Sequence, residues 1–262
     1  MNEDVVKYYT KIYDEELRLN ETCDNRHIVE REVKKKILKD YIAGNEKVLE
    51  IGAGTGLYSL YLAGLGCDVS ACDIVPKHVK QIKDKSKKLG LKVEALVSDA
   101  LEIPYKDNSY NLVMLSGPIY HLHGNENKKK AIKEAFRVCK ENGIIVVDYL
   151  SEIHGFIQHA LISSKYLSEC TSEEIDLGIC KDEVFSYDKK DNIINIMNEV
   201  GIKNINIYGT DSITRFIRED INNYTKDELL KWISFIYGIS NNQGTIELSE
   251  HCLAIGRKVR KR

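Results

Sequence analysis

The 262-residue sequence lacks the features that would place it in a membrane or among small secreted proteins. No apolar run approaches the ~20 residues that a membrane-spanning helix needs. The first residues, Met-Asn-Glu-Asp, lack the basic segment and apolar core of a signal peptide. The seven cysteines are an odd number without a C-x-x-C pair, which argues against a disulfide framework. We therefore expect a soluble, cytoplasmic protein with reduced thiols and no membrane partner.

The sequence also has little net charge and no metal-binding motif. Its 38 basic and 40 acidic residues leave a formal charge of −2, which makes a nucleic-acid partner held by overall charge unlikely. Most basic clusters alternate with acids, as on solvated helix faces, and only the tail at 257–262 keeps a nucleic-acid contact open. The histidines show no H-E-x-x-H spacing, so we expect no metal site.

The most informative segment is a glycine-rich turn within residues 47–63, KVLEIGAGTGLYSLYLA, between an apolar strand and a helix. The spacing is G-x-G-x-G, with Glu50 two places before the first of three glycines, Gly52, Gly54 and Gly56. Glycines allow positive φ and the close approach of a ligand to the backbone. A dinucleotide fingerprint would place a glycine at Leu57, and a phosphate loop would place a lysine after the turn. The spacing favours neither of these sites.

Strand-like and helix-like segments alternate through most of the chain, as in a parallel sheet with crossover helices. Apolar runs predict strands at 48–51, 68–73, 93–97, 111–115, 143–148, 205–208 and 251–259. Helical spacing marks 57–63, 76–89, 127–140, 188–200 and 226–237, together with an apolar segment at 156–167. The alternation is interrupted at about 151–186 and 210–250, and loops of this length often have structure or function of their own.

Three segments resemble the class I S-adenosylmethionine (SAM)-dependent methyltransferases, in particular the bacterial small-molecule enzymes of type 11. The turn is similar to their motif I, hydrophobic-hydrophobic-E/D-x-G-x-G-x-G. Residues 103–112 resemble the loop into strand four, although Asn111 replaces the usual aspartate, and 115–122, LSGPIYHL, is similar to LGPLYHL. The resemblance covers 46–150 well, and 187–208 and 251–259 loosely.

The resemblance implies an α/β, Rossmann-like fold with a seven-stranded, mostly parallel sheet in the order 3-2-1-4-5-7-6, its last strand antiparallel. It leads us to expect an N-terminal helical lid at 1–45. The SAM-binding domain would follow at 46–262, with helical cap insertions at about 151–186 and 210–250.

The resemblance also implies a SAM site at the ends of the first four strands, where open parallel sheets bind ligands. The turn would receive the amino-acid end of SAM, through Glu50, Gly52, Ala53, Gly54 and Gly56. Asp73, followed by Ile74, ends strand two, where an acid can bind both ribose hydroxyls, as in NAD proteins. Asp99 and the backbone of Ala100 would bind the adenine. The end of strand four would run beside the methyl group, through Leu115, Ser116 and Gly117.

Aromatic residues near this site are candidates for closure and for catalysis. Val5, Tyr9, Ile12 and Tyr13 would share one helix face. The resemblance implies that Tyr8, Tyr9 or Tyr13 closes over the cofactor. Tyr120 and His121 are the catalytic candidates, because a histidine can take a proton from an acceptor near neutral pH. In the alternative interpretation, Tyr120 packs against the cofactor and His121 caps the next helix.

The function implied is methyl transfer from SAM to a small-molecule acceptor by direct in-line displacement. RNA or protein methylation is an alternative, as is a non-catalytic SAM-binding module. An NAD-linked oxidoreductase is a more distant alternative. The sequence does not indicate the acceptor or the oligomeric state.

Overall fold

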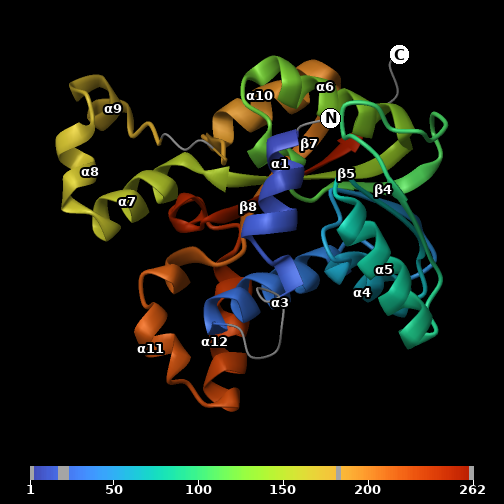
Figure 1. Cartoon of the computed structure of the whole chain (residues 1–262), viewed down its shortest axis with the longest axis horizontal. Coiled ribbons are helices and arrows are strands. Elements are labelled where there is room, and N and C mark those ends of the chain that lie inside the picture. The colour runs from blue at the N-terminus through green and yellow to red at the C-terminus, as the bar shows by residue number, and fades with distance from the viewer. Residues whose placement is uncertain (1–2, 17–23, 181–183, 260–262) are drawn as a thin grey trace.

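The computed structural model describes residues 3–16, 24–180 and 184–259 of the chain. They form a twisted sheet with helices around it (Figure 1). The sheet has the order β3-β2-β1-β4-β5-β8-β7, and a short strand β6 pairs with β5. The strands are β1 (Lys47–Ile51), β2 (Asp68–Asp73), β3 (Val93–Val97), β4 (Tyr110–Leu115), β5 (Cys139–Ser151), β6 (Tyr187–Asp188), β7 (Ile202–Gly209) and β8 (His251–Lys258).

The order confirms the predicted topology, with β7 and β8 as the sixth and seventh strands. Only β8 runs antiparallel to its neighbours, β5 and β7. The two-residue strand β6 was not predicted, because it is too short to show an apolar period. The central strands are buried on both faces, and Leu112, Val113 and Met114 of β4 have no exposed surface.

Helices cover both faces of the sheet (Figure 1). On one face, α6 (Asn125–Val138) and α10 (Lys190–Val200) bury Ala131 and Ile193 in the larger apolar core. On the other face, α3 (Asn25–Lys39), α4 (Leu57–Gly64) and α12 (Lys226–Ile239) bury Val33, Leu62 and Ile236. The helix α5 (Pro76–Leu89) packs beside them on β2 and β3.

Local signals set the ends of several of these helices. Pro76 occupies the first turn of α5, and Gly90 ends it in the left-handed conformation at φ 66°. Helix α12 begins with a capping box, in which Thr225 and Glu228 each satisfy the other's backbone N–H. These signals explain why the predicted bounds of α5 agree with the structure.

The predicted lid at 1–45 and the caps at about 151–186 and 210–250 stay predictions. Helix α3 belongs to the layer that covers the sheet, and α12 packs against it. Within 210–250, α12 is accompanied by η3 (Ser212–Arg215), α11 (Arg218–Asn222) and η4 (Ile246–Leu248). Residues 152–177 form an arm that extends away from the sheet (yellow in Figure 1), with the helices α7 (Glu152–Ile162), α8 (Ser164–Glu169) and α9 (Ser172–Leu177).

The N-terminal segment forms α1 (Glu3–Lys7) and a π-helical turn, η1 (Tyr8–Ile12). The predicted apolar face is therefore wrong at Ile12, whose side chain is 71% exposed. The reason is the wider π turn, which does not preserve the 3.6-residue period of an α-helix. No helix in the described ranges has both the length and the apolar character that crossing a membrane requires.

Candidate active site

A cavity of about 460 Å³ opens at the carboxyl ends of the parallel strands. Its walls come from the loops after β1 to β4, from the N-terminal segment, and from α3, β5 and β8. The volume lies within the range of small-molecule sites, and the position is the one where open parallel sheets bind ligands.

The glycine turn forms the floor of the cavity and is tightly held. The N–H groups of Gly52 and Ala53 both donate to the carbonyl oxygen of Cys72, at 2.8 and 3.0 Å. Gly52 has a φ of 73°, and a Cβ there would lie 2.5 Å from Cδ of Pro118. Glycine is therefore required at this position both for its conformation and for the close approach of the loop after β4.

Asp73 ties the end of β2 to the same turn. Its Oδ2 accepts a hydrogen bond from the Gly54 N–H at 2.7 Å, and its Oδ1 accepts from the Val75 N–H at 2.8 Å. Oδ1 also lies 3.2 Å from Nδ1 of His78. On the next strand, Asp99 lines the cavity and its Oδ1 accepts from the Leu101 N–H at 3.0 Å. Two carboxylates therefore follow the ends of β2 and β3, as predicted.

Glu50 is fully buried beneath the turn and lines the cavity. Its Oε2 accepts a hydrogen bond from the Ser59 hydroxyl, and its Oε1 has no hydrogen-bond partner among the described residues. Burial raises the pKa of Glu50 to about 7, because a charged carboxylate loses its hydration in this position. A cationic ligand group would supply the missing partner.

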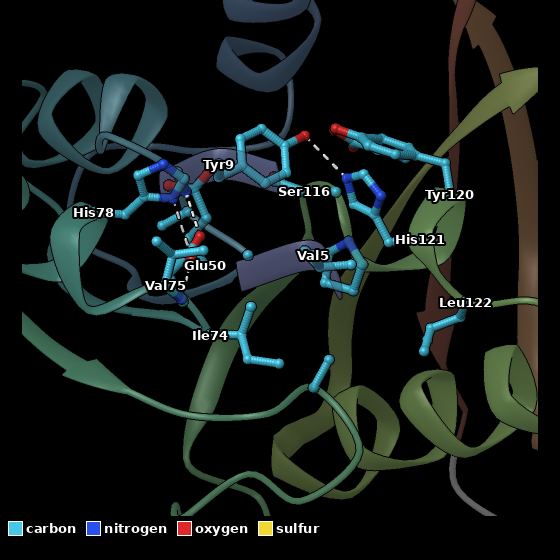
Figure 2. Close-up of a pocket in the computed structure, with 18 of the residues that line it drawn as sticks. Val5, Tyr9, Glu50, Ile74, Val75, His78, Ser116, Tyr120, His121 and Leu122 are labelled. Atoms are coloured by element: carbon cyan, nitrogen blue, oxygen red, sulfur yellow. Dashed lines mark hydrogen bonds and ion pairs between the residues drawn. The ribbon is translucent and has the colours of Figure 1, made fainter. Parts of the chain in front are cut away.

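Tyr9 and His121 meet across the cavity (Figure 2). The Tyr9 hydroxyl lies 2.9 Å from Nε2 of His121, and Nδ1 of His121 lies 3.2 Å from the carbonyl oxygen of Val184. A carbonyl oxygen only accepts, so Nδ1 carries the proton and Nε2 accepts from Tyr9. Catalysis by His121 stays a prediction, and it requires Tyr9 to move. The alternative role of Tyr120, packing against the cofactor, also stays a prediction.

Most of the predicted site residues line this one cavity. They are Glu50, Gly52, Ala53, Gly54, Asp73, Ile74, Asp99, Ala100, Ser116, Gly117, Tyr9, Tyr120 and His121. Gly56, Leu115 and Tyr13 are not among the described lining residues. Gly56 begins α4 against Ile82, Leu115 is buried in the core, and Tyr13 stacks on Tyr8. Their predicted roles in binding remain untested.

Sequence reasoning missed a charged end of the cavity, made by Glu30 and Lys34 of α3, Asp148 of β5 and His251 of β8. Lys34 forms an ion pair with Asp148, and its Nζ lies 4.0 Å from the centre of the Tyr58 ring. Burial raises the pKa of the Asp148 carboxyl more than Lys34 lowers it.

Two sequence signals could have revealed this end. Glu30 and Lys34 share the i, i+3, i+4, i+7 face of α3 with the apolar Val33 and Ile37. Asp148 ends a continuous apolar run in a strand that is covered on both sides. Charged residues in such positions are buried only when they are paired or functional.

The geometry agrees with comparisons to known proteins. A family model described as a methyltransferase domain matches residues 49–147. A demethylmenaquinone methyltransferase of Corynebacterium glutamicum is 31% identical over 102 residues, which are 39% of this chain and 40% of that protein. Residues 49–147 therefore match a SAM-dependent methyltransferase domain, and the cofactor of that domain is S-adenosylmethionine.

Two further relatives extend over more of the chain. A glycine/sarcosine N-methyltransferase of Aphanothece halophytica is 24% identical over 198 residues, 66% of this chain and 72% of that protein. The structure of magnesium protoporphyrin IX methyltransferase from Synechocystis PCC 6803, with bound SAH (S-adenosylhomocysteine), has a TM-score of 0.64 at 14% identity and covers 98% of this chain and 100% of that one. That likeness shows the fold. The chain spans about two fifths of the first curated relatives that it matches.

The residues of the cavity fit the cofactor of this domain. The unpartnered Oε1 of Glu50 can accept from an ammonium group, and Asp73 and Asp99 offer acceptors for hydroxyl and amino groups. No metal site was expected. The structure does bring ligand atoms of Asp211, Glu250 and His251 within 4.8 Å of one another, but Arg215 already forms an ion pair with Glu250.

Proposed function

We propose that this protein transfers a methyl group from SAM to a small-molecule acceptor. The observation that carries the proposal is the extent of the cavity, which continues from the glycine turn to the charged end on β5 and β8. Neighbouring strands are ~4.8 Å apart, so β8, three strands from β1, lies roughly 14 Å away. The charged end begins close to the turn, where Nζ of Lys34 lies 3.5 Å from the Ser116 hydroxyl, and its far side on β8 offers polar groups to a second molecule.

The residues that would hold SAM are those predicted along the first four strand ends. Gly52, Ala53 and Gly54 present a backbone without bulky side chains, and Glu50 supplies an acceptor for a cationic group. Asp73 would bind the ribose and Asp99 the adenine. When bound, SAM supplies an activated methyl group, so the protein does not need to activate the donor.

The remaining residues position the acceptor and exclude water. Val5 and Tyr9 form a wall contributed by the N-terminal segment (Figure 2). Pro118 contributes a wall after β4. Holding two reactants in alignment can lower a barrier by ~7–11 kcal/mol, more than one acid or base usually provides. Catalysis by this protein therefore does not depend on a strong base.

The relatives support a small acceptor without naming it. Their names refer to demethylmenaquinone, glycine or sarcosine, and norajmaline, while one relative from Arabidopsis thaliana acts on a tRNA uridine. The net charge of −2 and the enclosed charged end favour a small molecule over RNA.

Calorimetry with SAM and with S-adenosylhomocysteine, followed by a methyl-transfer assay, tests the proposal. The assay presents amines, alcohols, phenols, carboxylates and thiols, and mass spectrometry detects a gain of one methyl group. We expect saturable binding of both nucleosides and transfer to at least one class of acceptor. Absence of SAM binding would contradict the proposal. Binding without transfer to any small molecule would instead support a SAM-binding module.

A further inference from the structure

His251 has three carboxylates around one nitrogen of its ring. Its Nδ1 lies 3.6 Å from Asp211, 3.9 Å from Glu30 and 3.9 Å from Glu250. This nitrogen is buried, whereas the residue as a whole lines the cavity. These are ion-pair distances rather than hydrogen bonds, and Nδ1 has no hydrogen-bond partner among the described residues. In the tautomer that has its proton on Nδ1, facing the carboxylates, Nε2 keeps a lone pair.

We infer that His251 is the proton acceptor of the reaction and that the methyl acceptor is an amine. The inference rests on the proposed function and names the substrate class of the same site. The inference assigns the role of proton acceptor to His251 and not to His121, because both ring nitrogens of His121 already have hydrogen-bond partners, Tyr9 and the Val184 carbonyl.

The charges on the cavity wall favour a cationic guest. Six acids line the described part of the cavity. Glu50, Asp73 and Asp99 are assigned to SAM, whereas Glu30 and Asp148 lie at the charged end with Lys34, the one lysine or arginine among the described lining residues. Lys34 is engaged by Asp148. An alkylammonium group would therefore be attracted to the charged end, and a carboxylate or phenolate acceptor would be repelled.

An amine needs a proton acceptor, because ammonium groups of the lysine type have a pKa of about 10 and stay protonated near neutral pH. In the proposed step an N–H bond of the ammonium group breaks and the proton passes to Nε2 of His251. The electron pair stays on the amine nitrogen, which becomes the nucleophile. The imidazolium that forms is stabilised by the carboxylates beside Nδ1 and later releases its proton to water.

Other charged and titratable groups also surround His251 and belong in its pH dependence. They come from six neighbouring elements: α3, β5, η3, α7 and the ends of β7 and β8. The groups are Arg26, His27, Glu30, Lys34, Asp148, His154, Asp211, Arg215 and Glu250. Arg215 and Lys34 each pair with an acid, Glu250 and Asp148 respectively.

Binding separates the amine inference from the proposed function. Benzylamine, benzyl alcohol and benzoate share a ring and differ in the charge of the head group. We expect calorimetry on the S-adenosylhomocysteine complex to show benzylamine bound at least tenfold more tightly than the other two. Glu30→Gln should reduce that preference. Equal or tighter binding of benzoate would overturn the amine class, whatever the result for SAM.

The pH profile of methyl transfer tests the role of His251. His251→Asn should keep S-adenosylhomocysteine and benzylamine affinity within twofold but slow transfer to benzylamine by ~10²–10⁴-fold at pH 7. Transfer by the variant should recover tenfold per pH unit up to the pKa of benzylamine, because the free amine then needs no base. His159→Asn, on α7 outside the described lining, is the control and should behave as the unchanged protein does.

Three results would overturn the inference. The first is a His251→Asn profile parallel to that of the unchanged protein. The second is a protein that binds SAM and methylates alcohols or carboxylates but not benzylamine, tyramine or N-methylbenzylamine. The third is a divalent metal ion that copurifies with the protein and is lost in His251→Asn, since the ring would then be a ligand.

Discussion

The two ends of the cavity are built in different ways. At the cofactor end, the turns at the ends of single strands supply the groups that would bind the cofactor. Asp73 accepts hydrogen bonds from the N–H of residue 75, two positions along the chain, and from the N–H of residue 54 on the adjacent loop. At the charged end, Lys34 reaches Asp148 across 114 positions of the sequence. The first end depends on backbone conformation, and the second depends on buried charges that compensate one another.

The charged end should be the more sensitive to loss of a single charge. Lys34→Met leaves the Asp148 carboxylate buried without its ion-pair partner and should lower the free energy of unfolding by roughly 3–5 kcal/mol. Adding Asp148→Asn should restore part of this loss. Urea denaturation provides the measurement.

Lys80→Met is the matched control, because its pair with Asp84 is exposed on α5. It should have a far smaller effect. Equal losses in Lys34→Met and Lys80→Met would show that burial does not distinguish the two ion pairs.

At the cofactor end, Glu50 should make the ligand-free protein less stable as the pH rises. Its pKa is about 7 in the folded protein, above the ordinary value of 4.5 that applies when the chain is unfolded, so between these values the folded state binds more protons. The free energy of unfolding should therefore fall from about pH 4.5 to 7. Glu50→Gln should remove this slope and raise stability at pH 8 by up to about 3 kcal/mol, while weakening SAM binding.

Glu46→Gln supplies a control of opposite sign. Burial raises the pKa of the Glu46 carboxyl, but less than it raises that of Glu50. The backbone N–H groups of residues 43 to 45 donate hydrogen bonds to the Glu46 carboxylate and together hold its pKa below the usual range. Its stabilisation is present above the unfolded pKa and is lost as the pH falls through the folded pKa. Thermal melts from well below pH 4.5 to pH 8 should show that Glu46→Gln removes a rise of stability with pH below about pH 4.5, whereas Glu50→Gln removes a fall of stability with pH above it.

Asp73 tests the part of the cofactor end that sequence reasoning identified most directly. Asp73→Asn weakens the charge-assisted bond to the turn and, in the proposed function, the one to the ribose, which should reduce SAM affinity by roughly 10–100-fold. Asp68→Asn changes the exposed first residue of the same strand and should leave affinity unchanged. Calorimetry distinguishes them, and a similar loss in both would indicate a general effect on β2.

The smallest effect is expected at the contact that closes the cavity from the N-terminal side. Tyr9→Phe removes the hydrogen bond to His121, which contributes about 1 kcal/mol and should reduce SAM affinity by about fivefold. Tyr41→Phe removes a similar bond to Tyr208, and neither tyrosine is among the described lining residues, so affinity should not change. An unchanged affinity in Tyr9→Phe would mean that this segment does not contribute to binding.

Strand positions and the cofactor end were predictable because their signals are local. Apolar runs marked β1 to β5, β7 and β8, although β5 begins at Cys139, earlier than the predicted 143. The acids after β2 and β3 could be placed because parallel strands bring their carboxyl ends to one edge. The N-terminal face was mispredicted at Ile12, because a π turn has no periodic signature in the sequence.

The role of α3 and the charged end were not predictable in the same way. The sequence shows Glu30 and Lys34 within a helix but does not show which element the helix covers. Likewise, His251 begins a strand whose neighbours, β5 and β7, are chosen by the topology of the whole sheet. No pattern within a short stretch of sequence indicates that these residues are neighbours in the folded protein.

By itself, the sequence determined the alternation of strands and helices, the glycine turn and the acids that follow β2 and β3, because backbone conformation and apolar period act over a few residues. Only the tertiary structure decided that Tyr9 bonds to His121, that Lys34 pairs with Asp148, and that three carboxylates surround His251. The physical reason is that the energy of a buried charge depends on its spatial neighbours, which the fold brings together from distant parts of the chain.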